Sequence, residues 1–161
     1  MNLAVAVSPP TATPITGRES AALKGSPHAA LVEFYRALNG RDLALMQRHW
    51  AEGEEIAMDN PLGGIKRGWA EIGAVYQRVF GGPATVTVEF YDYTLHETPE
   101  MFYAVGRERG AFEREGTRIE LAIRTSRIFR RVHGAWRQVH HHGSIENPEL
   151  LARYQTAVFG R

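Results

Sequence analysis

Apolar residues recur every three or four positions in the first half of the chain, as they do along the buried face of a helix. Ser26 and Pro27 are typical of a helix start, and Asn39-Gly40 is typical of a helix end. The same spacing returns after Asp42 and again after Gly68. The pattern predicts three helices, over residues 27–39, 43–50 and 69–80. It also predicts one short strand over residues 55–59.

After Pro83 the spacing changes, and apolar residues alternate with polar ones as in strands with one buried face. The alternation predicts four strands, over residues 85–97, 101–112, 117–131 and 135–145. Short turn-like breaks separate them, which favours antiparallel hairpins. Three helices followed by such a meander predict an α+β fold, a cone-shaped curved antiparallel sheet packed against three N-terminal helices. The concave face of such a sheet is the expected place for a ligand.

The ends of the chain differ from this folded part. Residues 1–25 are rich in Pro, Thr and Ala and lack periodicity, so we expect a flexible tail, either loose or laid over a partner subunit. Residues 26–147 form the predicted α+β domain, and residues 148–161 form a C-terminal extension. No apolar run reaches the roughly 18 residues that cross a bilayer, and Leu3–Val7 lacks the preceding basic residues of a signal peptide. We expect a soluble, cytoplasmic protein with no membrane partner.

Charge and composition exclude several functions. The 161 residues include 19 basic and 18 acidic side chains, and the net charge of +1 gives no overall field to attract nucleic acid. The absence of cysteine excludes disulfides, thiolate metal sites and cysteine nucleophiles. The chain also lacks the glycine-rich phosphate loops and the Gly-x-Ser-x-Gly motif. We therefore expect no cofactor and no nucleic-acid partner.

Strand alternation predicts which charged side chains point toward the helices. The apolar positions that begin at Ile119 continue to Arg127, and those that begin at Val86 continue to Asp92. A charge on this face must be paired or hydrated, so the two residues could neutralise each other or hold a polar ligand. The alternative is that both strands have left the helices by that point, or that a bulge turns both side chains outward.

The run His140-His141-His142 lies in the last predicted strand. Alternation sends the first and third histidines to one face and His141 to the other. Two histidines at this spacing can share a metal ion, but the sequence does not place a third ligand beside them. We predict no metal site, and the alternative for this pair is a hydrogen-bonded or subunit-interface role.

Two stretches carry a resemblance to a known family. The first contains Asn60-Pro61-Leu62-Gly63, followed by Arg67-Gly68-Trp69-Ala70-Glu71-Ile72, and it is similar to the Asp-Pro-x-Gly loop and Gly-x-x-x-Ile helix start of ketosteroid isomerases. The second contains Ser126-Arg127-Ile128-Phe129, then Trp136-Arg137-Gln138-Val139-His140-His141-His142-Gly143-Ser144. It is similar to the Trp-x-x-Val-His-x-His-x-Ser strand of the association domain of calcium/calmodulin-dependent kinases and of bacterial SnoaL-like proteins.

Over residues 26–147 the chain thus resembles the nuclear transport factor 2-like superfamily, which includes ketosteroid isomerases and SnoaL-like polyketide cyclases. The resemblance implies the cone-shaped α+β fold. It also implies that Asn60 occupies the position of the isomerases' general base, where an amide cannot accept and return a proton. Tyr35 corresponds to their oxyanion-hole tyrosine, and Arg127 falls where the association domains carry a pocket arginine.

From these features we predict a small-molecule-binding protein with a pocket for a small polar or anionic ligand, assembled as a homodimer through the outer face of its sheet. Arg127 would supply the cation of the pocket. The other predicted ligand-binding residues are Tyr35, Trp50, Asn60, Tyr76, Asp92 and His141.

Two alternatives remain open. The first is a cofactor-independent isomerase, lyase or cyclase in which Asp59 or Asp92 abstracts a proton and Tyr35 or a histidine stabilises the oxyanion. The second is an oligomerisation module like the kinase association domain. A carboxylate in an apolar pocket would favour the enzyme, whereas a large stable ring with a blocked pocket would favour the module.

Overall fold

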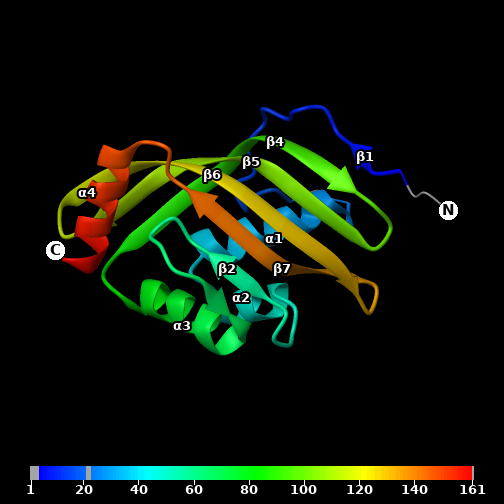
Figure 1. Ribbon diagram of the computed structural model, residues 1–161, viewed down its shortest axis with the longest axis horizontal. Helices are drawn as coiled ribbons and strands as arrows, with labels where there is room; N and C mark the ends of the chain where they lie inside the picture. The colour runs from blue at the N-terminus through cyan, green and yellow to red at the C-terminus, as the bar shows by residue number, and fades with distance from the viewer. Residues whose placement is uncertain (1–3, 21–22, 161) are drawn as a thin grey trace.

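The computed structural model describes residues 4–20 and 23–160 and shows one curved sheet with helices α1, α2 and α3 against one of its faces (Figure 1). The strand order in the sheet is β1-β4-β5-β6-β7-β2-β3. The strands are β1 (Ala6–Val7), β2 (Ala57–Asp59), β3 (Lys66–Arg67), β4 (Thr85–Glu97), β5 (Met101–Arg114), β6 (Thr117–Val132) and β7 (Ala135–Ser144). The helices are α1 (Pro27–Asn39), α2 (Leu43–His49), α3 (Gly68–Gly81) and α4 (Pro148–Phe159).

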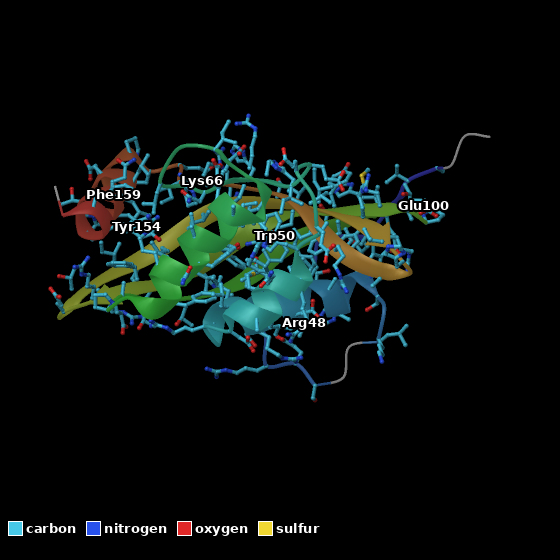
Figure 2. The ribbon with its side chains drawn as sticks, turned by 90° about the horizontal axis from the view of Figure 1, so that it is seen from below. Arg48, Trp50, Lys66, Glu100, Tyr154 and Phe159 are labelled. Carbon is cyan, nitrogen blue, oxygen red and sulfur yellow. The ribbon has the colours of Figure 1, made fainter. Side chains whose placement is uncertain are left out.

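This arrangement confirms the predicted α+β fold. The Ser26 side chain accepts a hydrogen bond from the Ala29 amide and begins α1, as its sequence position predicts. Strands β4 to β7 form the predicted antiparallel meander. The core lies between the sheet and the helices, and Figure 2 shows Trp50 within it while Arg48 of α2 points to solvent.

Strand β2 joins the far side of the meander. It pairs in parallel with β7, which places Ala57 beside His140 and Asp59 beside His142. Loop residues 60–65 then lead to β3 and α3. The register of β2 therefore determines which side chains of the 55–59 segment can meet those of the histidine run.

The N-terminal segment differs from the predicted tail. Residues Ser8, Thr11 and Ile15 bond through their backbones to β4, and Ile15 is fully buried. Instead of hanging free, residues 6–15 extend along the edge of the chain's own sheet, and the carbonyl groups of Thr16, Gly17 and Glu19 accept hydrogen bonds from α1 side chains. This placement satisfies backbone groups that an exposed edge strand would leave unpaired.

The C-terminal extension contains a helix that the sequence analysis did not predict. The Asn147 side chain caps α4 by accepting hydrogen bonds from the Glu149 and Leu150 amides. Leu150 and Tyr154 are buried against the rest of the protein. No helix in the described parts of the chain is long and apolar enough to cross a membrane.

Candidate functional site

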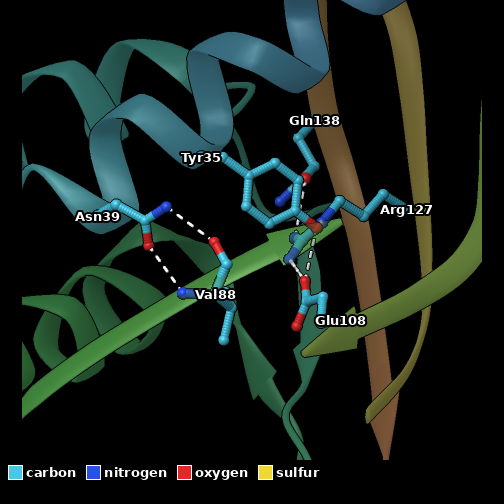
Figure 3. Close-up of polar contacts among 6 residues, drawn as sticks. All are labelled: Tyr35, Asn39, Val88, Glu108, Arg127 and Gln138. Carbon is cyan, nitrogen blue, oxygen red and sulfur yellow. Dashed lines mark hydrogen bonds and ion pairs between the residues drawn. The ribbon is translucent and has the colours of Figure 1, made fainter. Parts of the chain in front are cut away.

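A group of buried polar side chains connects α1 with the centre of the sheet (Figure 3). The Tyr35 hydroxyl of α1 donates to Glu108 Oε1 of β5 over 2.6 Å. Arg127 of β6 donates from Nη2 to the same oxygen over 2.8 Å, from Nη1 to Gln138 Oε1 over 3.2 Å, and from Nε to the Tyr35 hydroxyl over 3.3 Å. Four elements therefore meet at one guanidinium group.

This ion pair is almost completely removed from solvent. Arg127 is 1% exposed and Glu108 is 5% exposed. The guanidinium carbon also lies 3.5 Å from the centre of the Phe34 ring, close enough for a cation–π contact. Burial of two charges is costly, and here the ion pair and its hydrogen bonds offset that cost.

Burial also keeps the neighbouring phenols uncharged. It raises the pKa of Tyr35 well above its ordinary value of 10, although the positive charge of Arg127 opposes the shift. Burial likewise raises the pKa of Tyr76 to about 12. Both hydroxyl groups are therefore neutral hydrogen-bonding groups near pH 7.

A cavity of about 120 Å³ lies next to this polar group. Its walls are mostly apolar, and Arg127, Glu108 and His141 lie together at its polar part. The other lining residues are Phe34, Leu38, Met58, Asn60, Pro61, Leu62, Val75, Tyr76, Val79, Val86, Val88, Leu121, Ile123 and Tyr154. Helices α1, α3 and α4 and the concave face of the sheet all contribute to these walls.

One polar atom on a residue that lines the cavity lacks a hydrogen-bond partner among the described residues. His141 is 6% exposed, and its Nδ1 atom is buried and unpaired. Arg127 has five N–H groups, and three of them make the bonds given above. Burial and the nearby Arg127 charge lower the pKa of His141 well below 6.5, so its imidazole is neutral. The cavity can therefore offer both N–H donors and a neutral imidazole.

Comparison with known proteins assigns the chain to a family. The model of the SnoaL-like domain matches residues 28–148, which is most of the chain. The chain belongs to the SnoaL-like domain family. No curated protein matches this SnoaL-like chain in sequence.

Solved structures agree with this SnoaL-like fold. A protein from Thiobacillus denitrificans, provisionally named a calcium/calmodulin-dependent protein kinase type II association domain, is 25% identical with a TM-score of 0.63, covering 79% of this chain and 100% of its own. A provisionally named dehydratase of the nuclear transport factor 2-like family from Streptomyces avermitilis is 17% identical (TM-score 0.66; 72% and 90% covered). A ketosteroid isomerase-like protein from Erwinia carotovora is also 17% identical (TM-score 0.62; 74% and 93% covered). The last two likenesses concern the fold alone.

Most of the predicted ligand-binding residues gather in this SnoaL-like interior. Arg127, Asn60, Tyr76 and His141 line the cavity. Tyr35 is fully buried and reaches the site by holding Glu108 and Arg127. The Asn60 side chain accepts a hydrogen bond from the Leu62 amide and so also shapes the loop.

Trp50 is 2% exposed but does not belong to the described cavity lining. It sits at the end of α2, where its backbone forms an isolated bridge with Gln138 of β7. Trp50 is not among the residues that line this cavity, so its contact with a ligand stays a prediction.

The two predicted aspartates do not enter the cavity. Register in β4 shifts between Tyr91 and Thr94, and Asp92 adopts a φ of 48° within this bulge. Its exposed carboxylate faces Arg107, so the predicted pairing of Asp92 with Arg127 is wrong. Asp59 pairs with His142 on the other face of the sheet. Neither aspartate is among the residues that line this cavity.

Sequence reasoning missed Glu108 and Gln138 as members of the polar group. Glu108 shares its strand face with Phe102, Ala104 and Phe112, so the alternation in β5 contained the signal. In β7, alternation from Trp136 reaches Gln138, and a register shift between β6 and β7 then brings His141 inward.

Proposed function

We propose that this SnoaL-like protein binds a small organic molecule in the cavity between α1, α3 and the sheet. The observation that supports this most is His141 Nδ1, a buried atom at the cavity wall with no hydrogen-bond partner among the described residues; two of the five N–H groups of Arg127 also make no bond to these residues. A buried polar group without a partner costs about 1–3 kcal/mol. Of the six such side-chain atoms among the described residues, His141 Nδ1 is the one whose residue lines the cavity. A ligand with an oxygen atom at this position would supply the missing partners.

The charge balance favours a neutral ligand over an anion. Glu108 already compensates Arg127, so an added carboxylate would leave a second, uncompensated negative charge in a buried place. A carbonyl, amide or hydroxyl oxygen can accept from Arg127 without that cost. The apolar walls of the cavity would then contact a short hydrocarbon group of the same ligand. Of the polar and anionic ligands predicted from the sequence, we therefore propose the polar one.

The cavity volume limits the ligand size. A cavity of about 150 Å³ accommodates benzene, so 120 Å³ corresponds to about five non-hydrogen atoms. Propionamide and propionate have this size and the same shape, but only propionate is charged. The best small ligands gain about 1.5 kcal/mol per non-hydrogen atom, so five atoms limit the affinity to the micromolar range.

Ligand-observed NMR with these two probes tests the proposal. We expect saturable binding of propionamide with a Kd in the millimolar range or tighter, and weaker binding of propionate. The substitution Val79→Phe places a ring in the cavity and should abolish the signal. Ala74→Phe introduces the same side chain on the exposed side of α3 and should leave binding unchanged. Equal binding in both variants would contradict the proposal.

Glu108 supports a second candidate function, a cofactor-independent isomerase or lyase. It is the carboxylate at the cavity wall, and Tyr35 donates to one of its oxygens. A carboxylate beside a bound carbonyl compound can remove a proton from the adjacent carbon. Hydrogen–deuterium exchange into 2-butanone, followed by NMR, would reveal this chemistry. Exchange at the buffer rate, or exchange that is unaffected by Glu108→Gln, would contradict it.

We also propose that the protein is a homodimer formed through the outer face of the sheet. Helices α1 to α3 cover the concave face (Figure 1). Val105 of β5 is 43% exposed and lies in one register row with Ser126 and His142, so a dimer contact at Val105 would lie beside His142. Light scattering should give twice the chain mass of 18.0 kDa. A mass of one chain would contradict the dimer, and a larger ring would favour an oligomerisation module.

A further inference from the structure

Three side chains that commonly bind metals gather on the face of the sheet opposite the cavity. The parallel register of β2 and β7 places Asp59 directly beside His142. His140 and His142 share a strand face because they are two residues apart, while His141 lies on the cavity side. One ligand atom from each of Asp59, His140 and His142 lies within 4.8 Å of the other two.

His140 is already oriented as a metal-binding histidine. Its Nδ1 atom lies 3.0 Å from the carbonyl oxygen of Ala57. A carbonyl oxygen only accepts hydrogen bonds, so Nδ1 carries the proton and Nε2 keeps its lone pair. A histidine that binds a metal ion through one ring nitrogen typically donates a hydrogen bond from the N–H of the other nitrogen to a backbone carbonyl or a carboxylate. The ring of His140 therefore needs no change of tautomer to bind an ion.

The second histidine and the aspartate are close enough to share an ion. His142 Nδ1 lies 3.2 Å from Asp59 Oδ2, in a hydrogen bond whose proton would be released to solvent when both atoms bind one ion. Two ligands at about 2.1 Å from a tetrahedral ion are separated by about 3.4 Å. All three ligand atoms lie within 4.8 Å of one another, so a pair at that limit would have to approach by about 1.4 Å. The His142 side chain, which is 56% exposed in the single chain, has room to rotate.

We propose that Asp59, His140 and His142 form a binding site for a divalent transition-metal ion such as Zn²⁺. Two imidazole nitrogens and one carboxylate suit Zn²⁺ and its first-row neighbours, whereas Mg²⁺ and Ca²⁺ prefer oxygen ligands alone. Three protein ligands approaching from one side leave a coordination position for water. The site is separate from the cavity, although strand β7 contributes to both.

Neighbouring charges on this face permit a bound cation. Arg124 lies 3.2 Å from Glu146. Arg107 lies 3.4 Å from Asp92 and 3.5 Å from Glu146. These carboxylates offset the charges of Arg107 and Arg124, which line one surface hollow together with His142. Arg67, which pairs with Ala57 across β2 and β3, is a further positive charge beside the group.

The test is a competition titration of the full-length, untagged protein, freed of metal, against a chromogenic zinc chelator at pH 7.5. We expect one Zn²⁺ per chain, with no displacement by excess Mg²⁺. Asp59→Asn and His142→Gln should each weaken binding at least about tenfold. His133→Asn removes an exposed histidine outside the group and tolerates the positive φ of that turn, so it should bind like the original protein.

Visible absorption of the Co²⁺-loaded protein provides a second measurement, because its intensity reports the coordination number. We expect the band to disappear in the Asp59 and His142 variants. Absence of Zn²⁺ binding, or equal affinity in these variants and in the original protein, would overturn the proposal. The same variants should still bind propionamide, so failure of the metal site and failure of the cavity proposal can be distinguished.

Discussion

At the residue scale, the cavity depends on the ion pair between Arg127 and Glu108. Replacing Arg127 by Met leaves the Glu108 carboxylate buried without its counter-charge, which should lower the free energy of unfolding by about 3–5 kcal/mol. Urea unfolding measures this loss. Adding Glu108→Gln to the same chain should restore part of the stability, because the uncompensated charge is then gone. A double variant no more stable than Arg127→Met would contradict this explanation.

The buried histidine makes stability dependent on pH. Burial lowers the pKa of His141 well below 6.5, its ordinary value in an unfolded chain. As the pH falls below 6.5, the unfolded chain takes up a proton that the folded chain does not, so stability is complete above that pH and declines below it. The decline from one such residue is at most about 1.4 kcal/mol per pH unit.

His141→Gln should therefore reduce the slope of unfolding free energy against pH between pH 6.5 and 5. His49 retains its own contribution there, because its pKa is also lowered by burial. His133→Asn serves as the exposed control and should keep the original slope. Identical slopes in all three proteins would show that His141 is not the residue that resists protonation.

Alternation along the strands predicted the inward direction of Arg127 but failed for Asp92. The difference is local: β6 keeps its alternation from Ile119 to Arg127, whereas β4 contains a bulge at Asp92. A bulge depends on how neighbouring strands pack, so apolar alternation within one strand does not reveal it. Glu108, the carboxylate at the cavity, lies on the inward face that the alternation of β5 defines. In the sequence it stands between Arg107 and Arg109, so the apolar pattern did not single it out.

At the scale of elements, the three helices and four long strands were predictable because each has its own period and its own turn residues. Helix α4 was not predicted, although Asn147 caps it and Pro148 is its first residue. The N-terminal segment has no periodic pattern of apolar residues. That segment is held by backbone bonds to β4 and by one buried side chain, Ile15. Such contacts form between distant parts of the chain, so local pattern cannot predict them.

The close packing of β4 against β5 can be tested at Gly110. A Cβ atom at this position would collide with the carbonyl oxygen of Thr87. Gly110→Ala should therefore lower the free energy of unfolding by about 1–3 kcal/mol, as overpacked substitutions do. A Cβ atom at Gly81, at the end of α3, would meet open space, so Gly81→Ala should have little effect. Equal effects of the two substitutions in urea unfolding would contradict the close approach.

At the scale of the whole molecule, the order of elements and the two motifs were enough to predict the fold, but not the shape of the cavity. Its walls come from three helices, the 60–62 loop and five strands, and its volume depends on how all these side chains pack. The two faces of β7 carry different chemistry, with His141 at the cavity and His140 and His142 on the other side. The sequence predicted that division, but the position of Asp59 beside His142 required the parallel pairing of β2.

The central claim is that the cavity binds a small polar molecule, and methionine methyl NMR tests it most directly. Met58 lines the cavity, whereas Met101 is 39% exposed at the start of β5. Titration of methyl-labelled protein with propionamide should shift the Met58 resonance in a saturable way and leave Met101 unchanged. A Met58 resonance that does not move, or that moves together with Met101, would contradict the claim.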